Sequence, residues 1–199
     1  MSNLVLTKSY SEPPISEREI LRYAGCVTPD GETLALLSSA LGEARGEIAY
    51  RVCYRILPLK ISGNRCDFGL FSVESGDLAK NLDGAEKVIL FSATLGLSLD
   101  RLIAKYSRLS PSRALMLQAI GTERIEALCD TFLEDAPKEL GDCLRPRFSA
   151  GYGDLPLSAQ RDIFKALDCE RQIGVFLNES LIMSPSKSVT AFVGVGKRE

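Results

Sequence analysis

The period of the hydrophobic pattern changes several times along the chain, and each change marks an expected element. Five segments carry apolar residues at every third or fourth position, the spacing of one helix face: residues 16–25, 28–44, 97–109, 110–135 and 158–168. Four segments alternate apolar and polar residues or form short apolar runs, which predicts strands: residues 49–61, 66–73, 86–96 and 188–195. Helices and strands do not alternate regularly, so the sequence predicts an α+β fold with mostly antiparallel pairing in a single domain, residues 1–199.

Local signals refine the ends of these elements. Residues 1–14 are expected to form an extended arm. Ser16 and Glu19 have the spacing of a capping box at the start of the first helix. Pro58 implies that its strand is an edge strand or bends, and Pro137 is expected to end the long helix. Gly121 lies inside that helix, where glycine costs roughly 1 kcal/mol relative to alanine, so close packing or close approach of a ligand is expected there.

Composition narrows the class of protein. The 199 residues carry a formal net charge of −2. This charge offers no basic field for nucleic acid and no polybasic segment for a membrane surface. No apolar run approaches the roughly 20 residues that span a bilayer, and the first residues lack the pattern of a signal peptide. A cytoplasmic protein is therefore expected.

Cysteine and histidine content limits the chemistry. The six cysteines are scattered without a C-x-x-C pair, which argues against a zinc ribbon or a redox motif and favours reduced, mostly buried thiols. The chain contains no histidine, which excludes a Ser-His-Asp triad and a histidine general base. No metal site is predicted. Any chemistry must rely on tyrosine, carboxylates, arginine or a cofactor that performs the difficult step.

The segment RPRFSAGYGDLP, residues 145–156, allows three interpretations. A dinucleotide loop is disfavoured, because Pro156 stands where the third glycine is needed and no buried strand precedes it. A plain turn before the next helix is favoured by the abundance of glycine, proline and aspartate. The third interpretation is a ligand-binding wall. Arg147 would bind a carboxylate, Gly151 and Gly153 would allow the backbone to approach closely, and Tyr152 would offer a ring and a hydroxyl.

A resemblance favours the third interpretation. The pattern R-x-x-x-G-Y-x-x-x-P before a helix resembles the activation (reactivation) domain of cobalamin-dependent methionine synthase, in its free-standing form. A second block in residues 174–189, a Gly-x-x-Leu-Asn-Glu-Ser stretch leading into Met-x-Pro-x-x-Ser-Val, matches the same family. The matching residues are Arg147, Gly151, Tyr152, Pro156, Gly174, Leu177, Asn178, Glu179, Ser180, Met183, Pro185, Ser188 and Val189.

The resemblance implies a mostly antiparallel curved sheet packed with helices, and it implies binding of S-adenosylmethionine (AdoMet). Arg147 would contact AdoMet, with Ser149 and Gly151 lining the adenosyl pocket. Tyr152 would approach the corrin near cobalt, as the residue closest to the chemistry. Glu126 would hold the AdoMet amino group, although a one-residue shift of the match would place Ala127 there. In the family, cob(II)alamin is reduced by one electron and the product is trapped by methyl transfer from AdoMet.

Partners follow from the same resemblance. Cobalamin would be carried by a corrinoid methyltransferase, most simply a methionine synthase lacking its own activation domain. The electron would come from an external donor such as a flavodoxin or ferredoxin. The chain ends at Glu199 without the family's C-terminal tyrosine and strand, so AdoMet is expected to bind weakly without a complex. Two alternatives stay open: a non-catalytic docking module for a corrinoid protein, and an ordinary AdoMet methyltransferase, which the missing Rossmann loop disfavours.

Overall fold

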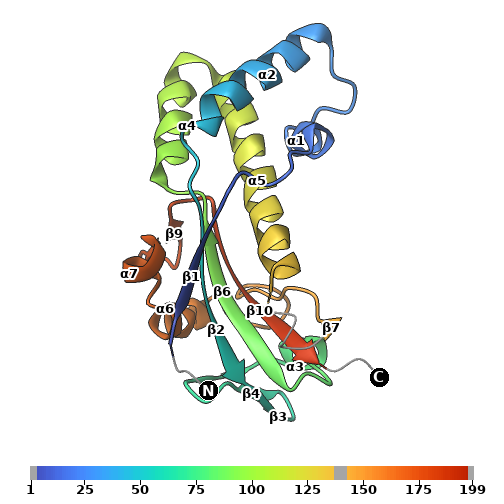
Figure 1. Cartoon of the computed structure of the whole chain (residues 1–199), viewed down its shortest axis with the longest axis vertical. Coiled ribbons are helices and arrows are strands. Elements are labelled where there is room, and N and C mark those ends of the chain that lie inside the picture. The colour runs from blue at the N-terminus through green and yellow to red at the C-terminus, as the bar shows by residue number, and fades with distance from the viewer. Residues whose placement is uncertain (1–3, 137–142, 197–199) are drawn as a thin grey trace.

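The computed structural model describes residues 4–136 and 143–196, and its centre is a five-stranded sheet (Figure 1). All four strand pairings of this sheet are antiparallel. The strands, in their order across the sheet, are β1 (Leu6–Tyr10), β2 (Tyr50–Pro58), β6 (Lys87–Thr94), β10 (Ser188–Gly196) and β7 (Cys143–Leu144). The predicted α+β fold, with a curved antiparallel sheet packed with helices, is confirmed.

Helices cover both faces of the sheet, because successive residues of each strand point to opposite faces. Ala191 and Val193 of β10 join one core cluster, and Phe192 between them joins a second cluster on the other face. The first cluster is covered by α1 (Glu17–Tyr23), α2 (Gly31–Arg45), α4 (Leu97–Leu109) and α5 (Pro111–Glu134). The second cluster is covered by α3 (Gly76–Asn81), α6 (Gln160–Leu167) and α7 (Cys169–Ile173).

Two small sheets complete the described chain and correct one prediction. The first contains β3 (Lys60–Ser62), β4 (Arg65–Asp67) and β5 (Ser72–Glu74); the second pairs β8 (Phe176–Leu177) with β9 (Met183–Ser184). The single strand predicted over residues 66–73 is wrong, because β4 and β5 share that stretch and pair with each other. Pro58 is the last residue of β2 and pairs only with β6, because β1 reaches no further along β2 than Tyr54; the predicted edge position is therefore confirmed.

The N-terminal arm is extended as predicted, and part of it is a strand of the main sheet. β1 pairs with β2 over its whole length. The arm is then held against α5 by Arg124, whose guanidinium donates to the carbonyls of Pro13 and Pro14 at 2.6 Å each. Glu123 pairs with Arg124 at 2.5 Å, and both side chains are buried. This buried ion pair fixes the point where the arm crosses the long helix.

The start of α1 shows half of the predicted capping box. Ser16 Oγ accepts from the backbone N–H of Glu19 at 3.4 Å, as expected of an N-cap residue. The N–H of Ser16 donates to Glu123 of α5 at 2.9 Å, and Glu19 pairs instead with Arg22. The capping interaction is thus shared with a distant helix, which links α1 to the buried ion pair.

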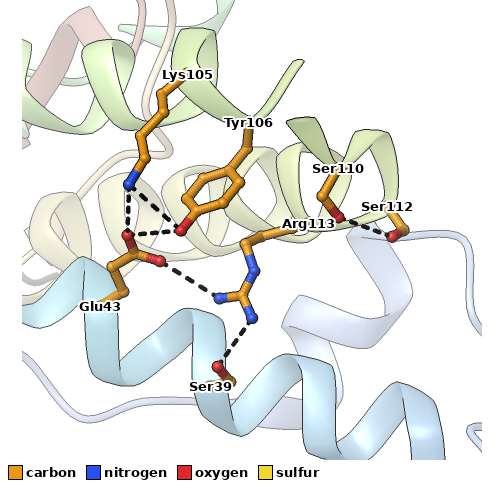
Figure 2. A network of polar contacts seen from close by, with 7 residues as sticks. All are labelled: Ser39, Glu43, Lys105, Tyr106, Ser110, Ser112 and Arg113. Carbon is orange, nitrogen blue, oxygen red and sulfur yellow. Dashed lines mark hydrogen bonds and ion pairs between the residues drawn. The ribbon is translucent and has the colours of Figure 1, made fainter. Parts of the chain in front are cut away.

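A polar network joins α2, α4 and the beginning of α5 (Figure 2). Tyr106 Oη donates to Glu43 at 2.9 Å, and Lys105 Nζ lies 3.5 Å from the same carboxylate. Arg113 pairs with the second oxygen of Glu43 at 3.4 Å and donates to Ser39 Oγ at 2.9 Å. Figure 2 shows side chains from three helices converging on Glu43. These contacts set the position of the N-terminal end of α5.

Gly121 in the middle of α5 is a point of close packing. A Cβ at this position would lie 2.9 Å from Leu99 Cδ2 and 2.9 Å from Lys187 Cε. The prediction of close approach at Gly121 is therefore confirmed, and the approaching groups belong to α4 and to the segment before β10. The predicted stop signal, Pro137, lies outside the described residues, as does Glu199.

The six cysteines are free thiols, and four of them are buried, as predicted. Cys53 on β2 and Cys169 on α7 lie side by side in the second core cluster. The contact with Cys169 and the burial of the thiol both raise the pKa of Cys53.

Within residues 4–136 and 143–196, no helix is long and apolar enough to cross a membrane.

Candidate functional site

The segment 145–156 runs along the outer edge of β10 before it turns away. Arg145 donates its backbone N–H to Gly194 at 2.8 Å, and Phe148 exchanges two backbone hydrogen bonds with Phe192 at 2.9 and 2.8 Å. A tight turn follows, in which Gly151 N–H donates to Leu155 at 2.9 Å. Gly151 needs its glycine for this turn, because its φ of +91° disfavours any side chain.

Asp154 fastens the tip of this loop to the start of α3. Its carboxylate accepts the hydroxyl of Ser75 and the backbone N–H groups of Gly76 at 2.8 Å and Asp77 at 3.2 Å. The hydroxyl of Ser75 and these N–H groups hold the pKa of Asp154 below its usual range. Gly153 adopts a φ of +52°, and a Cβ there would collide with the Asp77 carboxylate. The loop is therefore preorganised by a distant helix end.

Arg147 and Glu126, which the sequence nominated separately, lie together. Arg147 Nη2 is 2.8 Å from Glu126 and 3.1 Å from Asp130, one turn further along α5. Burial alone would lower the pKa of Arg147. The neighbouring Cys129, Glu126 and Asp130 have the larger, opposite effect, so the pKa of Arg147 is raised. Burial also raises the pKa of the adjacent Cys129 thiol to about 12. The guanidinium is thus charged, and Cys129 is an inert thiol.

A cavity of about 370 Å³ lies beside the loop and joins the two sequence blocks. Ser149 and Tyr152 of the first block line it, and Met183, Ser188 and Val189 of the second block line it as well. The remaining lining residues are Ala150, Leu157, Gln160, Leu181, Ile182, Ser186 and Thr190. Arg147, Glu126 and Gly151 are not among the lining residues: the first two sit on the α5 side of β10, and Gly151 shapes the turn.

The edge of β10 is open where it meets this cavity. Phe192 directs its N–H and C=O towards Phe148, and residues two positions apart in an antiparallel strand point the same way. Thr190 and Ser188 therefore aim their backbone groups at the cavity, where the described chain offers them no backbone partner. Their side chains form a polar floor, with Thr190 Oγ1 donating to Gln160 at 2.9 Å and Ser188 Oγ donating to Thr94 at 2.8 Å.

The rim of the cavity is apolar and exposed. The Tyr152 ring is 59% exposed, meets Phe148 edge-on with centroids 6.2 Å apart, and is joined at the rim by Leu157 and Ile182. The turn between β8 and β9 holds Ile182 in place, because Asn178 Oδ1 accepts its N–H at 2.9 Å. A flat apolar molecule or a partner surface could cover this rim.

Sequence reasoning missed several residues that build the site. Asp100 at the start of α4 accepts the N–H and the hydroxyl of Ser186, both at 2.7 Å, and so fixes the segment before β10. Asp154 acts on α3, and Gln160 supports the cavity floor. Asp154 lies inside the 145–156 motif, and Gln160 lies near the start of the helix predicted after it, but the sequence assigned neither residue a role. The helix predicted over residues 158–168 begins instead with a 3₁₀ turn, Leu157–Ala159.

The class defined by this fold is an α+β domain with helices on both faces of a curved antiparallel sheet and a cavity of about 370 Å³ at one sheet edge. The antiparallel pairing differs from the parallel sheet of a Rossmann-type methyltransferase.

Neither a family model nor a curated protein matches the sequence. Among solved structures, the chain is similar to the MetH reactivation domain bound to AdoHcy, with a TM-score of 0.68 over 96% of this chain and 78% of that chain, at 15% identity. The two proteins share a fold.

Proposed function

We propose that the protein binds AdoMet and supports reductive methylation of cob(II)alamin on a corrinoid methyltransferase. The partner we infer is a B12-dependent methionine synthase that lacks its own activation domain. One observation carries the proposal. The two sequence blocks, separated by residues 157–173, line one cavity, in a fold shared with a reactivation domain that was crystallised with AdoHcy.

Charge exchange at Arg147 fits an amino-acid ligand. In the free protein the Arg147 guanidinium and the Glu126 carboxylate satisfy each other at 2.8 Å. An α-amino acid group presents a carboxylate and an ammonium a few ångströms apart. The ligand carboxylate would take a place beside Arg147 and the ligand ammonium a place beside Glu126. Arg147 would then pair with the ligand carboxylate in place of Glu126, and Glu126 would pair with the ligand ammonium in place of Arg147. Neither side chain would be left without an opposite charge.

The adenosyl group would lie in the cavity itself. The open edge of β10 at Thr190 and Ser188 provides backbone donors and acceptors for a heterocycle. Leu157, Leu181 and Ile182 provide apolar contact. A volume of about 370 Å³ lies within the range of small-molecule sites.

Tyr152 and the apolar rim would face the partner. The partner's corrin, once reduced by one electron from an external donor such as a flavodoxin or ferredoxin, would supply the nucleophile for the methyl group, and AdoHcy would be the other product. This chain would position the methyl donor. Holding the reacting atoms in line at near-attack distance lowers the barrier to methyl transfer. The exposed Tyr152 ring offers a flat surface at the cavity mouth. No general base is needed, which agrees with a chain that has no histidine.

Calorimetry with AdoMet and AdoHcy tests binding, and methylcobalamin absorbance tests function. Wild-type protein should bind both ligands, and Arg147→Ala should weaken AdoMet about ten- to a hundredfold, as expected for loss of a charge-assisted hydrogen bond. Arg108→Ala, at an exposed arginine near the end of α4, serves as the matched control. With reductant and a cob(II)alamin-loaded partner, Arg147→Ala should lose methylation that Arg108→Ala retains. Equal rates for the two variants would contradict the proposal.

A different outcome would favour the docking alternative. If neither AdoMet nor AdoHcy binds at millimolar concentration, but the protein still forms a complex with a corrinoid protein, it acts as a non-catalytic module. Methyl transfer to a small acceptor without any corrinoid would favour an ordinary methyltransferase instead.

A further inference from the structure

Lys187 occupies an unusual position between the cavity and α5. It lies between Ser186 and Ser188, which both line the cavity. Its aliphatic chain crosses to α5 and packs into the space that Gly121 leaves open, with Cγ 3.0 Å and Cε 2.9 Å from the place a Cβ would take. Its backbone is fixed as well, because the carbonyl of Lys187 accepts from Leu95 at 3.0 Å. The fold therefore holds this side chain in one direction.

The ammonium group of Lys187 has one neutral hydrogen-bond partner. Nζ donates to Thr122 Oγ1 at 3.0 Å. The Thr122 hydroxyl in turn donates a hydrogen bond to the carbonyl of Gln118 at 3.0 Å. Within the described residues, no carboxylate comes within ion-pair distance of Nζ. Asp100 acts on it from further away, and its two oxygens are engaged by Ser186. An ammonium has three hydrogens to donate, so two remain for a ligand.

Lys187 and Arg147 lie along the same stripe of α5. Thr122, Glu126 and Asp130 follow one another at intervals of four residues, the spacing of one helix face. Lys187 contacts the first of these residues and Arg147 the other two. The two cations are thus attached about 6 Å apart along the helix axis, given a rise of about 1.5 Å per residue. Val189, which lines the cavity, follows Lys187 by two residues and lies on the α5 side of β10.

We propose that Lys187 is a second cation of the ligand site, which binds the ligand's carboxylate together with Arg147 at the α5 edge of the cavity. The inference rests on the proposed function and extends it. In the Met-x-Pro-x-x-Ser-Val block, Lys187 stands at an unspecified position, so the resemblance assigns it no role.

The charge balance of the stripe fits this ligand. Asp100, Glu126 and Asp130 contribute three negative charges, and Arg147 and Lys187 contribute two positive ones, which leaves one net negative charge. AdoMet carries a sulfonium, an ammonium and a carboxylate, and hence one net positive charge. The two cations would meet the carboxylate, and the surplus of carboxylates would balance the two positive groups of the ligand.

The first test compares ligands that differ only in the carboxylate. Lys187→Met keeps the aliphatic packing against Gly121 and removes the charge, and Lys60→Met on exposed β3 is the matched control. By calorimetry, Lys187→Met should weaken AdoMet about ten- to a hundredfold and should leave decarboxylated AdoMet within about twofold of wild type. Equal losses for both ligands, or no loss for AdoMet, would overturn the assignment.

The second test needs no adenosyl ligand. Burial lowers the pKa of Lys187 below that of an ordinary lysine, which leaves more of its amine reactive. Pulse acylation followed by mass spectrometry should show that millimolar methionine slows modification of Lys187 and not of Lys60. Protection by methionine without any AdoMet binding would uphold the carboxylate site and reject the adenosyl function. Labelling of Lys187 that methionine leaves unchanged would reject the carboxylate site even where AdoMet binds.

Discussion

The buried Glu123–Arg124 pair provides the sharpest stability prediction. The side chains are 6% and 1% exposed, and they form the junction of the N-terminal arm, α1 and α5. Glu123→Ala removes one partner and leaves the Arg124 guanidinium buried, still bonded to the carbonyls of Pro13 and Pro14 but without the paired carboxylate. It also deprives the N–H of Ser16 of its acceptor. Breaking a buried pair from one side costs roughly 3–5 kcal/mol, a large share of the 5–15 kcal/mol that typically separates folded from unfolded protein.

Urea unfolding followed by circular dichroism measures this loss. With a slope of about 2–3 kcal/mol per M, the midpoint of Glu123→Ala should fall by about 1–2.5 M. The double variant Glu123→Leu/Arg124→Met should recover part of the loss, because it removes the unpaired buried charge but leaves the N–H of Ser16 and the carbonyls of Pro13 and Pro14 without their partners. Asp135→Ala, which breaks the exposed pair with Lys8, is the control and should shift the midpoint little. A Glu123→Ala midpoint no lower than that of Asp135→Ala would refute the reasoning.

Two further outcomes are expected. Gly121→Ala places a Cβ 2.9 Å from Leu99 and Lys187, so it should destabilise the protein by about 1–3 kcal/mol in urea unfolding; an unchanged midpoint would show that both neighbours move freely. The carboxylate of Asp154 has a lowered pKa in the folded state, so its contribution is present above the unfolded value of 3.8 and lost as pH falls through the folded value. Wild type should therefore lose more thermal stability between pH 5 and pH 2.5 than Asp154→Asn, and parallel losses would contradict this role.

Most of the fold could be predicted from hydrophobic periodicity. The long helix and the two central strands β6 and β10 have strong patterns, because their buried faces are continuous over many residues. The elements that escaped prediction include α3 and α7, with six and five residues, the two-residue strands β7, β8 and β9, and β1, whose strand character depends on pairing with β2. Segments this short carry less than two turns of pattern, so tertiary contacts decide their structure.

The site was predictable only where a local pattern marks it. Arg147, Tyr152 and Glu126 were nominated from the sequence, and the structure places Arg147 beside Glu126. The support beneath them was not predictable, since Asp154 contacts Ser75 across 79 positions in the sequence. The direct Arg147–Glu126 contact likewise depends on how α5 crosses β10. Contacts between residues so far apart in the sequence cannot be predicted from the spacing of residues within one segment.

If the protein has the proposed function, the path of the 145–156 loop around the edge of β10 would have a kinetic consequence. Arg147 points to the α5 face of the sheet, while Tyr152 and the cavity rim lie on the α6 side. A ligand held by both would straddle the strand edge, with its amino-acid end inward and its methyl end at the open mouth. A partner docked over Tyr152 would then close the route by which that ligand arrives. The cycle would have a compulsory order, in which the methyl donor binds first and the demethylated product departs only after the partner has dissociated.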